Sequence, residues 1–349
     1  MRFASLRRTA VLSGFLAAVL LVGGCGSSED GAAPNVADES VADESVADEN
    51  FETVTIDSAL GRAVISEKPE RIVTLGMGSA ETAIALGTVP VGIEEYPWGS
   101  DESGYLPWIY DAVPADRLPE QFTGGTELNV EAVLALDPDL ILAPWSGITQ
   151  QQFDALNDFA PVVAYEEQPW TITWEDQIGV IGKAMGEEER AAEEIDKIKS
   201  RFADAAAAHP EYSDVTFSYI YNTGPGTLGV FLAEEQRVAM VRALGLQVDP
   251  VVNTLEEVAG TDSAVIGLEN ANKLNDSDLI FTFYSDPENR RETEAQPAYN
   301  VIPAIGRGSV VAPTDQPFVT GSSIINPLTV PWALEQYVPM IDDAVAKLN

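Results

Sequence analysis

A long stretch of helical sequence divides this chain into two parts of similar texture. From about Thr173 to Ala208 the composition is helical, without a strand pattern and with one break at Gly186. On either side, short β-rich runs alternate with helical runs, which is the pattern of sheets covered by helices. The 22 residues from Glu187 to Ala208 would span roughly 33 Å as a helix. We therefore predict an α/β fold in which two α/β lobes with mainly parallel sheets are joined by a single long rigid α-helix.

The body of the chain is too long for one typical core, which also favours two lobes. We expect an N-terminal lobe over residues 51–175, a connecting helical region over 176–209 and a C-terminal lobe over 210–349. A helix is predicted over 80–86 with Ser79 as its N-cap. The predicted strands cover 71–75, 89–93, 140–143, 162–165, 215–221, 227–231, 279–284 and 309–312, and a final helix covers 331–348.

The first 24 residues have the pattern of an export signal. Arg2, Arg7 and Arg8 precede an apolar run over residues 10–24, which is shorter than the roughly 20 residues that span a bilayer. Small residues before Cys25 resemble a bacterial lipoprotein signal, so residues 1–24 are predicted to be removed and Cys25 to carry the lipid. An ordinary signal or an uncleaved anchor helix remains an alternative, and the export route stays open.

Residues 25–50 are predicted to form an acidic disordered tether. The unit Val36–Ser40 recurs at Val41–Ser45 and, with Asn50 in the last place, at 46–50. Such a repeat, rich in charge and with one valine per unit, buries too little apolar surface to offset the entropy of ordering. Like charges extend it, so the folded body would stand away from the membrane.

The charge balance excludes polyanions as partners. The formal net charge is −37, and without the three arginines of the signal it becomes −40, with 16 basic against 56 acidic residues. Such a chain repels nucleic acid. With its one cysteine predicted to carry lipid, the protein has no thiol left for a disulfide.

The sequence offers little to an enzyme. It has no Gly-x-Ser-x-Gly elbow, and Gly76-Met77-Gly78 lacks the third glycine of a dinucleotide loop. Its one histidine, His209, is expected to be a solvated helix end, and no Cys or His cluster is available to hold zinc or copper. We predict that the protein is not an enzyme; a lipid-anchored enzyme is the remote alternative.

Aromatic residues follow the predicted strands at the edge where open α/β sheets bind ligands. Rings provide faces for a flat or bulky ligand, and arginines provide charge and stacking. Core packing and pairing with carboxylates remain alternative roles for these residues. The predicted ligand-binding residues are Tyr96, Trp98, Trp145 and Trp170 in the first lobe, and Tyr221, Tyr284, Arg290 and Arg291 in the second.

A weak internal similarity links the two halves. In each, a helical segment with a glutamate and a leucine precedes an aspartate and a strand. Two copies of one plan and the general likeness of helix-turn-strand units both remain possible readings. The matched residues are Glu131, Leu136 and Asp139 with Glu269, Leu274 and Asp278.

Several segments, in their order and spacing, resemble the iron-siderophore substrate-binding lipoproteins of ABC importers, the family that also includes binders of ferrichrome, ferric enterobactin and vitamin B12. Other segments resemble its actinobacterial branch. The first set is Pro69–Val73, Asp137–Ile141, Ser146–Gln150 and Ala160–Val163, and the second is Tyr96–Gly99, Leu106–Trp108, Pro169-Trp170, Ile302–Ala304 and Pro327–Leu334.

The resemblance implies a class III substrate-binding fold, two lobes on one rigid helix. It implies a monomer on the extracytoplasmic face of the cell membrane, anchored through Cys25, that captures a ferric siderophore between the lobes and delivers it to an ABC permease. Because a siderophore already surrounds Fe(III) with oxygens, the protein needs no metal ligand or intrinsic cofactor. Permease docking is implied for Glu81 and, by a looser match, for Glu234 or Glu235.

Within this class, the acidic surface favours neutral or cationic hydroxamate chelates slightly over anionic catecholates. The alternative ligand is haem or a corrinoid. Haem usually takes an axial ligand, and here only tyrosines and methionines are available for that role.

Overall fold

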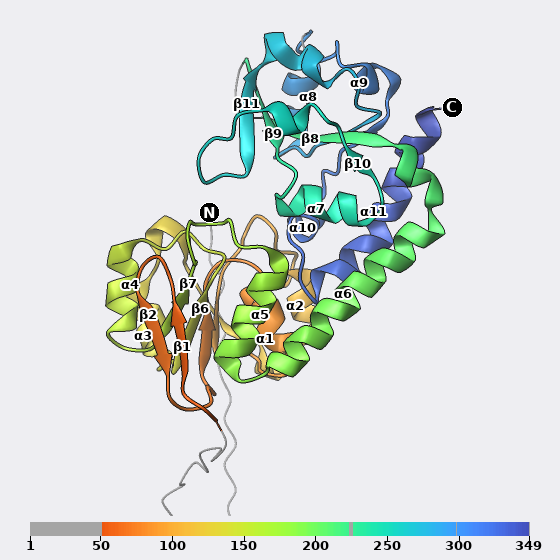
Figure 1. The fold of residues 1–349 in the computed structure, drawn as a ribbon. Coiled ribbons are helices and arrows are strands. Elements are labelled where there is room, and N and C mark those ends of the chain that lie inside the picture. Colours follow the sequence, from red (N-terminus) through yellow and green to blue (C-terminus); the bar gives the residue numbers. More distant parts are fainter. Residues whose placement is uncertain (1–50, 223–225, 298, 349) are drawn as a thin grey trace, which may run out of the picture. The chain divides into compact units, whose positions relative to one another are not determined.

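A computed structural model describes residues 51–222, 226–297 and 299–348 (Figure 1). The predicted signal, the tether and Cys25 lie outside the described residues. Within these ranges, no helix has both the length and the apolar character needed to cross a membrane.

The first sheet consists, among the described residues, of five parallel strands in the order β5-β4-β3-β6-β7. Its central strands are buried on both faces, as is typical of a parallel sheet covered by helices. A hairpin of β1 (Val54–Asp57) and β2 (Arg62–Ile65) precedes it. The strands are β3 (Ile72–Thr74), β4 (Gly92–Glu94), β5 (Glu120–Phe122), β6 (Leu140–Ala143) and β7 (Val162–Ala164).

Helix α1 follows β3, and the prediction of Ser79 as its N-cap was wrong. Gly78 caps the helix with a φ of 83°, and Ser79 is its first residue. Glycine adopts this left-handed conformation without strain, and the Glu81 carboxylate accepts a hydrogen bond from the Gly78 amide at 3.0 Å. The helices are α1 (Ser79–Ala85), α2 (Pro107–Ala112), α3 (Val130–Ala135) and α4 (Gln150–Asn157), with short 3₁₀ turns at Ala115–Arg117 and Gly125–Glu127.

The long helical region forms two helices, α5 (Trp174–Met185) and α6 (Glu188–Ala208). The break lies at Gly186, as predicted, because this residue ends α5 with a φ of 68°. Gly182 lets the two helices approach, since a β-carbon there would lie 2.3 Å from the β-carbon of Ala191. The single long helix between the two sheets is thus confirmed.

The second sheet is mixed. Strand β8 pairs in parallel with β10 and β12, and β12 with β13, but β9 is antiparallel to both β8 and β11. Strands β10 and β11 had not been predicted. The strands are β8 (Thr216–Asn222), β9 (Thr227–Phe231), β10 (Gln247–Val248), β11 (Ser263–Gly267), β12 (Leu279–Phe281) and β13 (Val310–Val311).

Helices surround this sheet, and one buried cluster of side chains includes residues of both sheets and of α5, α6 and α11. The helices are α7 (Gln236–Ala243), α8 (Pro287–Glu294), α9 (Pro303–Arg307), α10 (Gln316–Gly321) and α11 (Thr329–Val345), with 3₁₀ turns at Pro210–Asp214, Val252–Thr254, Leu268–Leu274 and Ala346–Leu348.

Asp139 and Asp278 occupy equivalent places in the two sheets. Asp139 accepts hydrogen bonds from the backbone amides of Glu70 and Arg71, just before β3, at 2.7 and 2.9 Å. Asp278 accepts one from the amide of Thr216, the first residue of β8, at 2.9 Å. Asp139 directly precedes β6, which pairs in parallel with β3. Asp278 directly precedes β12, which pairs in parallel with β8. The shared arrangement favours two copies of one plan over a chance likeness.

Candidate functional site

Loops at the carboxyl ends of the first sheet come together. The amide of Gly76, after β3, donates to the Glu94 carboxylate at the end of β4 at 2.9 Å. Gly76 also lies against the loop after β6, where a β-carbon on it would be 1.9 Å from the Trp145 carbonyl oxygen. Only a glycine fits this position, which also has a φ of 71°. We call the loops after β4, β6 and β7 the aromatic loops.

Two predicted tryptophans in the aromatic loops contact each other. The rings of Trp145 and Trp170 meet edge to face, with centroids 4.7 Å apart and an interplanar angle of 72°. Trp145 is half-buried, whereas Trp170 is 41% exposed. A large exposed ring fixed by a second ring is suited to stacking on a ligand.

The backbone of Trp170 is strained. Its φ is 67°, a left-handed conformation that is uncommon for a bulky residue. Such outliers persist where the surroundings hold them, often at ligand sites. Here Gly147 provides the space, because a β-carbon there would lie 2.6 Å from the Trp170 ring.

Tyr96 and Trp98 follow β4. The Tyr96 hydroxyl bonds to the Glu94 carboxylate, and burial, with the nearby Glu94 and Glu81 charges, raises its pKa well above the usual value. Burial likewise raises the pKa of Glu94, and hydrogen bonds from Gly76 and Tyr96 only partly offset it. Trp98 is 40% exposed.

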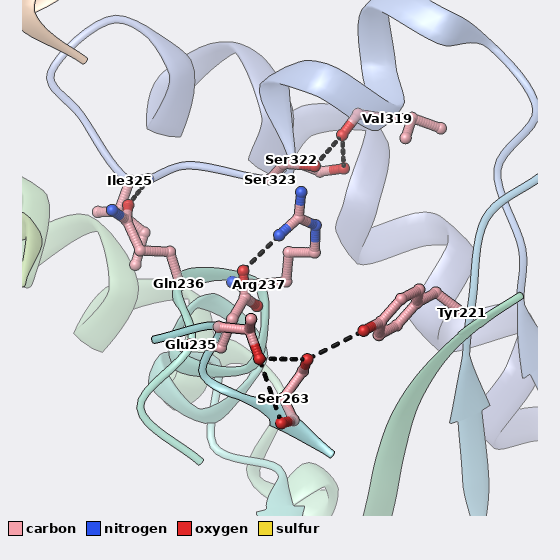
Figure 2. Close-up of polar contacts among 10 residues, drawn as sticks. Tyr221, Glu235, Gln236, Arg237, Ser263, Val319, Ser322, Ser323 and Ile325 are labelled. Carbon is pink, nitrogen blue, oxygen red and sulfur yellow. Dashed lines mark hydrogen bonds and ion pairs between the residues drawn. The ribbon is translucent and has the colours of Figure 1, made fainter. Parts of the chain in front are cut away.

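In the second half, Tyr221 lies at the end of β8 with its ring stacked on Phe231, at 4.4 Å between centroids. Its hydroxyl and the Ser263 hydroxyl on β11 are hydrogen-bonded at 2.9 Å, as Figure 2 shows. The Tyr221 side chain is half-buried.

Sequence analysis missed Arg237, on the first turn of α7 beside this group (Figure 2). Its guanidinium carbon lies 4.7 Å from the centroid of Phe231 and 5.9 Å from that of Phe283. It forms an ion pair with Glu235. Burial raises the pKa of Glu235, and the positive charge of Arg237 only partly offsets this rise. The Arg237 Nε has no hydrogen-bond partner among the described residues. Nothing in the sequence separates it from a surface arginine of an acid-rich chain.

The remaining candidates form a separate group around α8. Tyr284 is only 2% exposed, and its hydroxyl is hydrogen-bonded to that of Tyr299 at 2.9 Å. Arg290 lies 5.6 Å from the Tyr284 ring and pairs with Glu294 at 2.8 Å. Arg291 is exposed and lies 3.9 Å from Glu288. Burial raises the pKa of Tyr284. Tyr284 thus has the environment of a core residue.

Comparison with known proteins identifies the family of this α/β chain. A family model described as periplasmic binding protein matches residues 72–317.

The chain belongs to this family.

Its curated relatives include a probable siderophore-binding lipoprotein of Bacillus subtilis, 30% identical over 59% of this chain and 57% of the relative. The Fe(3+) dicitrate-binding periplasmic protein of Escherichia coli is 25% identical over 74% of this chain and 81% of its own length. The chain thus spans little more than half of the first relative.

Solved structures agree with the fold. The complex of Streptococcus pneumoniae PiaA with ferrichrome superposes with a TM-score of 0.76 at 29% identity, covering 84% of this chain and 99% of that one. A periplasmic solute-binding protein of Mycobacterium smegmatis, 23% identical with a TM-score of 0.71, shares the fold. The predicted fold class is confirmed.

The three acidic residues considered for docking differ in accessibility in this binding protein. Glu81 is 1% exposed, and its carboxylate accepts hydrogen bonds from the Gly78 amide at 3.0 Å and from Trp108 Nε1 at 2.9 Å. Burial raises its pKa. Glu235 is buried against Arg237. Glu234 has a side chain that is 79% exposed, with one contact to Arg242 at 2.8 Å.

Among the described residues, one group of three side chains could hold a metal ion: His209, Glu211 and Asp342. All three lie at or beyond the C-terminal ends of α6 and α11, away from the aromatic loops in sequence.

Proposed function

We propose that this binding protein captures a ferric siderophore and delivers it to an ABC importer. The observation that carries the proposal is the Trp145–Trp170 pair, a partly exposed ring pair held by a strained backbone at the carboxyl end of a parallel sheet. The relatives named above are described as siderophore or ferric dicitrate binders, which supports the same ligand class. Residues 51–175 and 210–349 act as two lobes, the ligand lies between them, and no reaction follows.

We infer further that the ligand is a neutral or cationic hydroxamate complex. The described arginines near the candidate residues each face a carboxylate: Arg237 faces Glu235, Arg290 faces Glu294 and Arg291 faces Glu288. These pairs leave little net positive charge to attract a tricatecholate, and the acidic surface repels anions. Three hydroxamates neutralise the charge of Fe(III). Their complex therefore needs no positively charged site and is not repelled by the acidic surface.

A corrinoid is the second candidate. A cobalamin-binding protein of Halobacterium salinarum is 27% identical over 51% of this chain and 46% of its own length. A corrinoid is also large and apolar-faced, so the ring pair alone does not distinguish it from a hydroxamate complex.

The protein acts as a monomer on the outer face of the membrane, held by lipid on Cys25. Glu234, whose carboxylate is the most exposed of the three candidates, contacts the permease. Mass spectrometry of the membrane-bound protein tests the anchor: residues 1–24 should be absent and Cys25 should carry the lipid, and an unmodified Cys25 would contradict lipid anchoring.

Tryptophan fluorescence tests the ligand class. Titration with ferrioxamine or ferrichrome should quench emission at sub-micromolar concentration, whereas a ferric tricatecholate, haemin and cyanocobalamin should bind at least 10-fold more weakly. Trp170→Ala should abolish tight binding. Tyr110→Ala removes another aromatic side chain that is 41% exposed, but on α2, and should leave affinity unchanged. A preference for cyanocobalamin would favour the second candidate.

A further inference from the structure

His209, Glu211 and Asp342 bring one imidazole and two carboxylates together. His209 follows the last residue of α6, Glu211 lies in the next 3₁₀ turn, and Asp342 comes from α11. His209 Nδ1 lies 3.1 Å from Asp342 Oδ1 and 3.6 Å from Glu211 Oε1, and all three candidate ligand atoms lie within 4.8 Å of one another.

This spacing fits a metal centre. Ligand atoms bound to zinc at 2.0–2.2 Å in a tetrahedron lie about 3.3–3.6 Å apart. Two of the distances are at or near that range, and the two carboxylate oxygens need only a small side-chain rotation to complete a three-ligand face. Water would occupy the fourth position, because both carboxylates are about half exposed.

The ligands are oriented by a buried neighbour. Tyr212, 1% exposed, donates its hydroxyl to Asp342 Oδ1 at 2.7 Å and stacks on the His209 ring, with centroids 4.8 Å apart and an angle of 21°. Partners of this kind fix a ligand's orientation and are worth 10–100-fold in metal affinity. The histidine lies at the end of α6, as predicted from sequence, but it is held in place and its side chain is only 22% exposed, so it is not a solvated residue.

We propose that His209, Glu211 and Asp342 bind a borderline divalent cation of the Zn²⁺ class. Imidazole with carboxylates suits such a cation, whereas Mg²⁺ and Ca²⁺ prefer oxygen ligands alone. The bound ion joins the end of α6 to α11 and so stiffens the junction between the long helix and the C-terminal helix. This site is independent of the siderophore proposal, because it shares no residue with the aromatic loops.

Calorimetry on the purified full chain in detergent tests the site. Zn²⁺ is added in physiological salt, with excess Mg²⁺ present to occupy surface carboxylates that bind cations non-specifically. One equivalent should bind, and His209→Ala or Asp342→Asn should weaken binding at least 10-fold. Asp343→Asn, the neighbouring exposed acid, is the matched control and should change nothing.

A spectroscopic readout separates a metal site from a plain ion pair. Because His209 is the only histidine in the sequence, its imidazole gives one set of NMR signals, which Zn²⁺ should shift or broaden at one equivalent. Tyr212→Phe should weaken binding about 10-fold without abolishing it. Zinc binding that survives His209→Ala, or imidazole signals that ignore zinc, would overturn the proposal.

Discussion

The ring of Trp170 occupies the space in which a side chain on Gly147 would lie, with only 2.6 Å between that β-carbon position and the ring. The glycine after β6 and the tryptophan after β7 therefore depend on each other. Because Trp170 also has a φ of 67°, its exposed position is a property of the packed loops and not of a free side chain.

Gly147→Ala should displace Trp170 and weaken siderophore binding at least 10-fold, since the ring can no longer lie against Trp145. The free energy of unfolding should change little, because the Trp170 ring is already 41% exposed. Gly179→Ala on α5 is the matched control, as its β-carbon meets no atom within 4 Å. Equal affinities for the two variants would show that Trp170 does not contact the ligand.

Arg237→Met should destabilise the fold by about 3–5 kcal/mol, because it leaves Glu235 buried without its partner. The double variant Glu235→Gln with Arg237→Met should recover most of that loss, as measured by urea unfolding. Arg290→Met removes a pair that is about half exposed and should cost under about 1 kcal/mol. A double variant as unstable as Arg237→Met alone would contradict this account of the pair.

Stability should rise as pH falls from 7 towards 5. Burial raises the folded-state pKa of Glu81, Glu94 and Glu235, so these groups bind protons more readily in the folded state. Their stabilisation is complete below the unfolded pKa, near 4.5, and is lost as pH rises through the folded pKa.

Thermal melts at several pH values measure this effect. Glu94→Gln should reduce the gain in Tm on acidification, and Glu102→Gln, at an exposed position, should not. Acidification also weakens the repulsion among the excess carboxylates, which raises the Tm of every variant. The difference in Tm gain between Glu94→Gln and Glu102→Gln therefore reports the effect of Glu94 itself. Parallel Tm profiles would argue against a role for Glu94.

Glu234→Arg should impair uptake of the loaded complex in cells while leaving ligand affinity unchanged. Asp343→Arg makes the same charge change at an exposed position of α11 and serves as the control. Glu81→Ala should act differently: it removes the acceptor of two buried hydrogen bonds and should cost about 1–3 kcal/mol in stability. Normal import by Glu234→Arg would exclude this residue from docking.

The parts of the fold that follow local patterns were predictable. Buried runs such as Leu140–Ala143 and Thr227–Phe231 became strands with the expected ends, and Gly186 broke the helical region. Strand β5 escaped prediction because two of its three residues are exposed and polar. The antiparallel direction of β9 has no local signal, since it depends on which neighbour the strand pairs with.

The candidate site was predictable in its first half and less so in its second. The rule that loops after buried strands hold ligands pointed to Trp145, two residues after β6, and to Trp170, in the loop after β7. Tyr284 contacts Tyr299, fifteen residues away, and Arg237 lies over the ring of Phe283, 46 residues away, so neither environment shows in a local pattern. Tertiary contacts, not residue type, decide such cases.

Native mass spectrometry of the protein purified from iron-starved cells tests the central claim most directly. We expect an added mass equal to one intact ferric hydroxamate siderophore, lost in the Trp170→Ala variant and retained in Tyr110→Ala. A haem or corrinoid mass, or an added mass that persists without Trp170, would contradict the account.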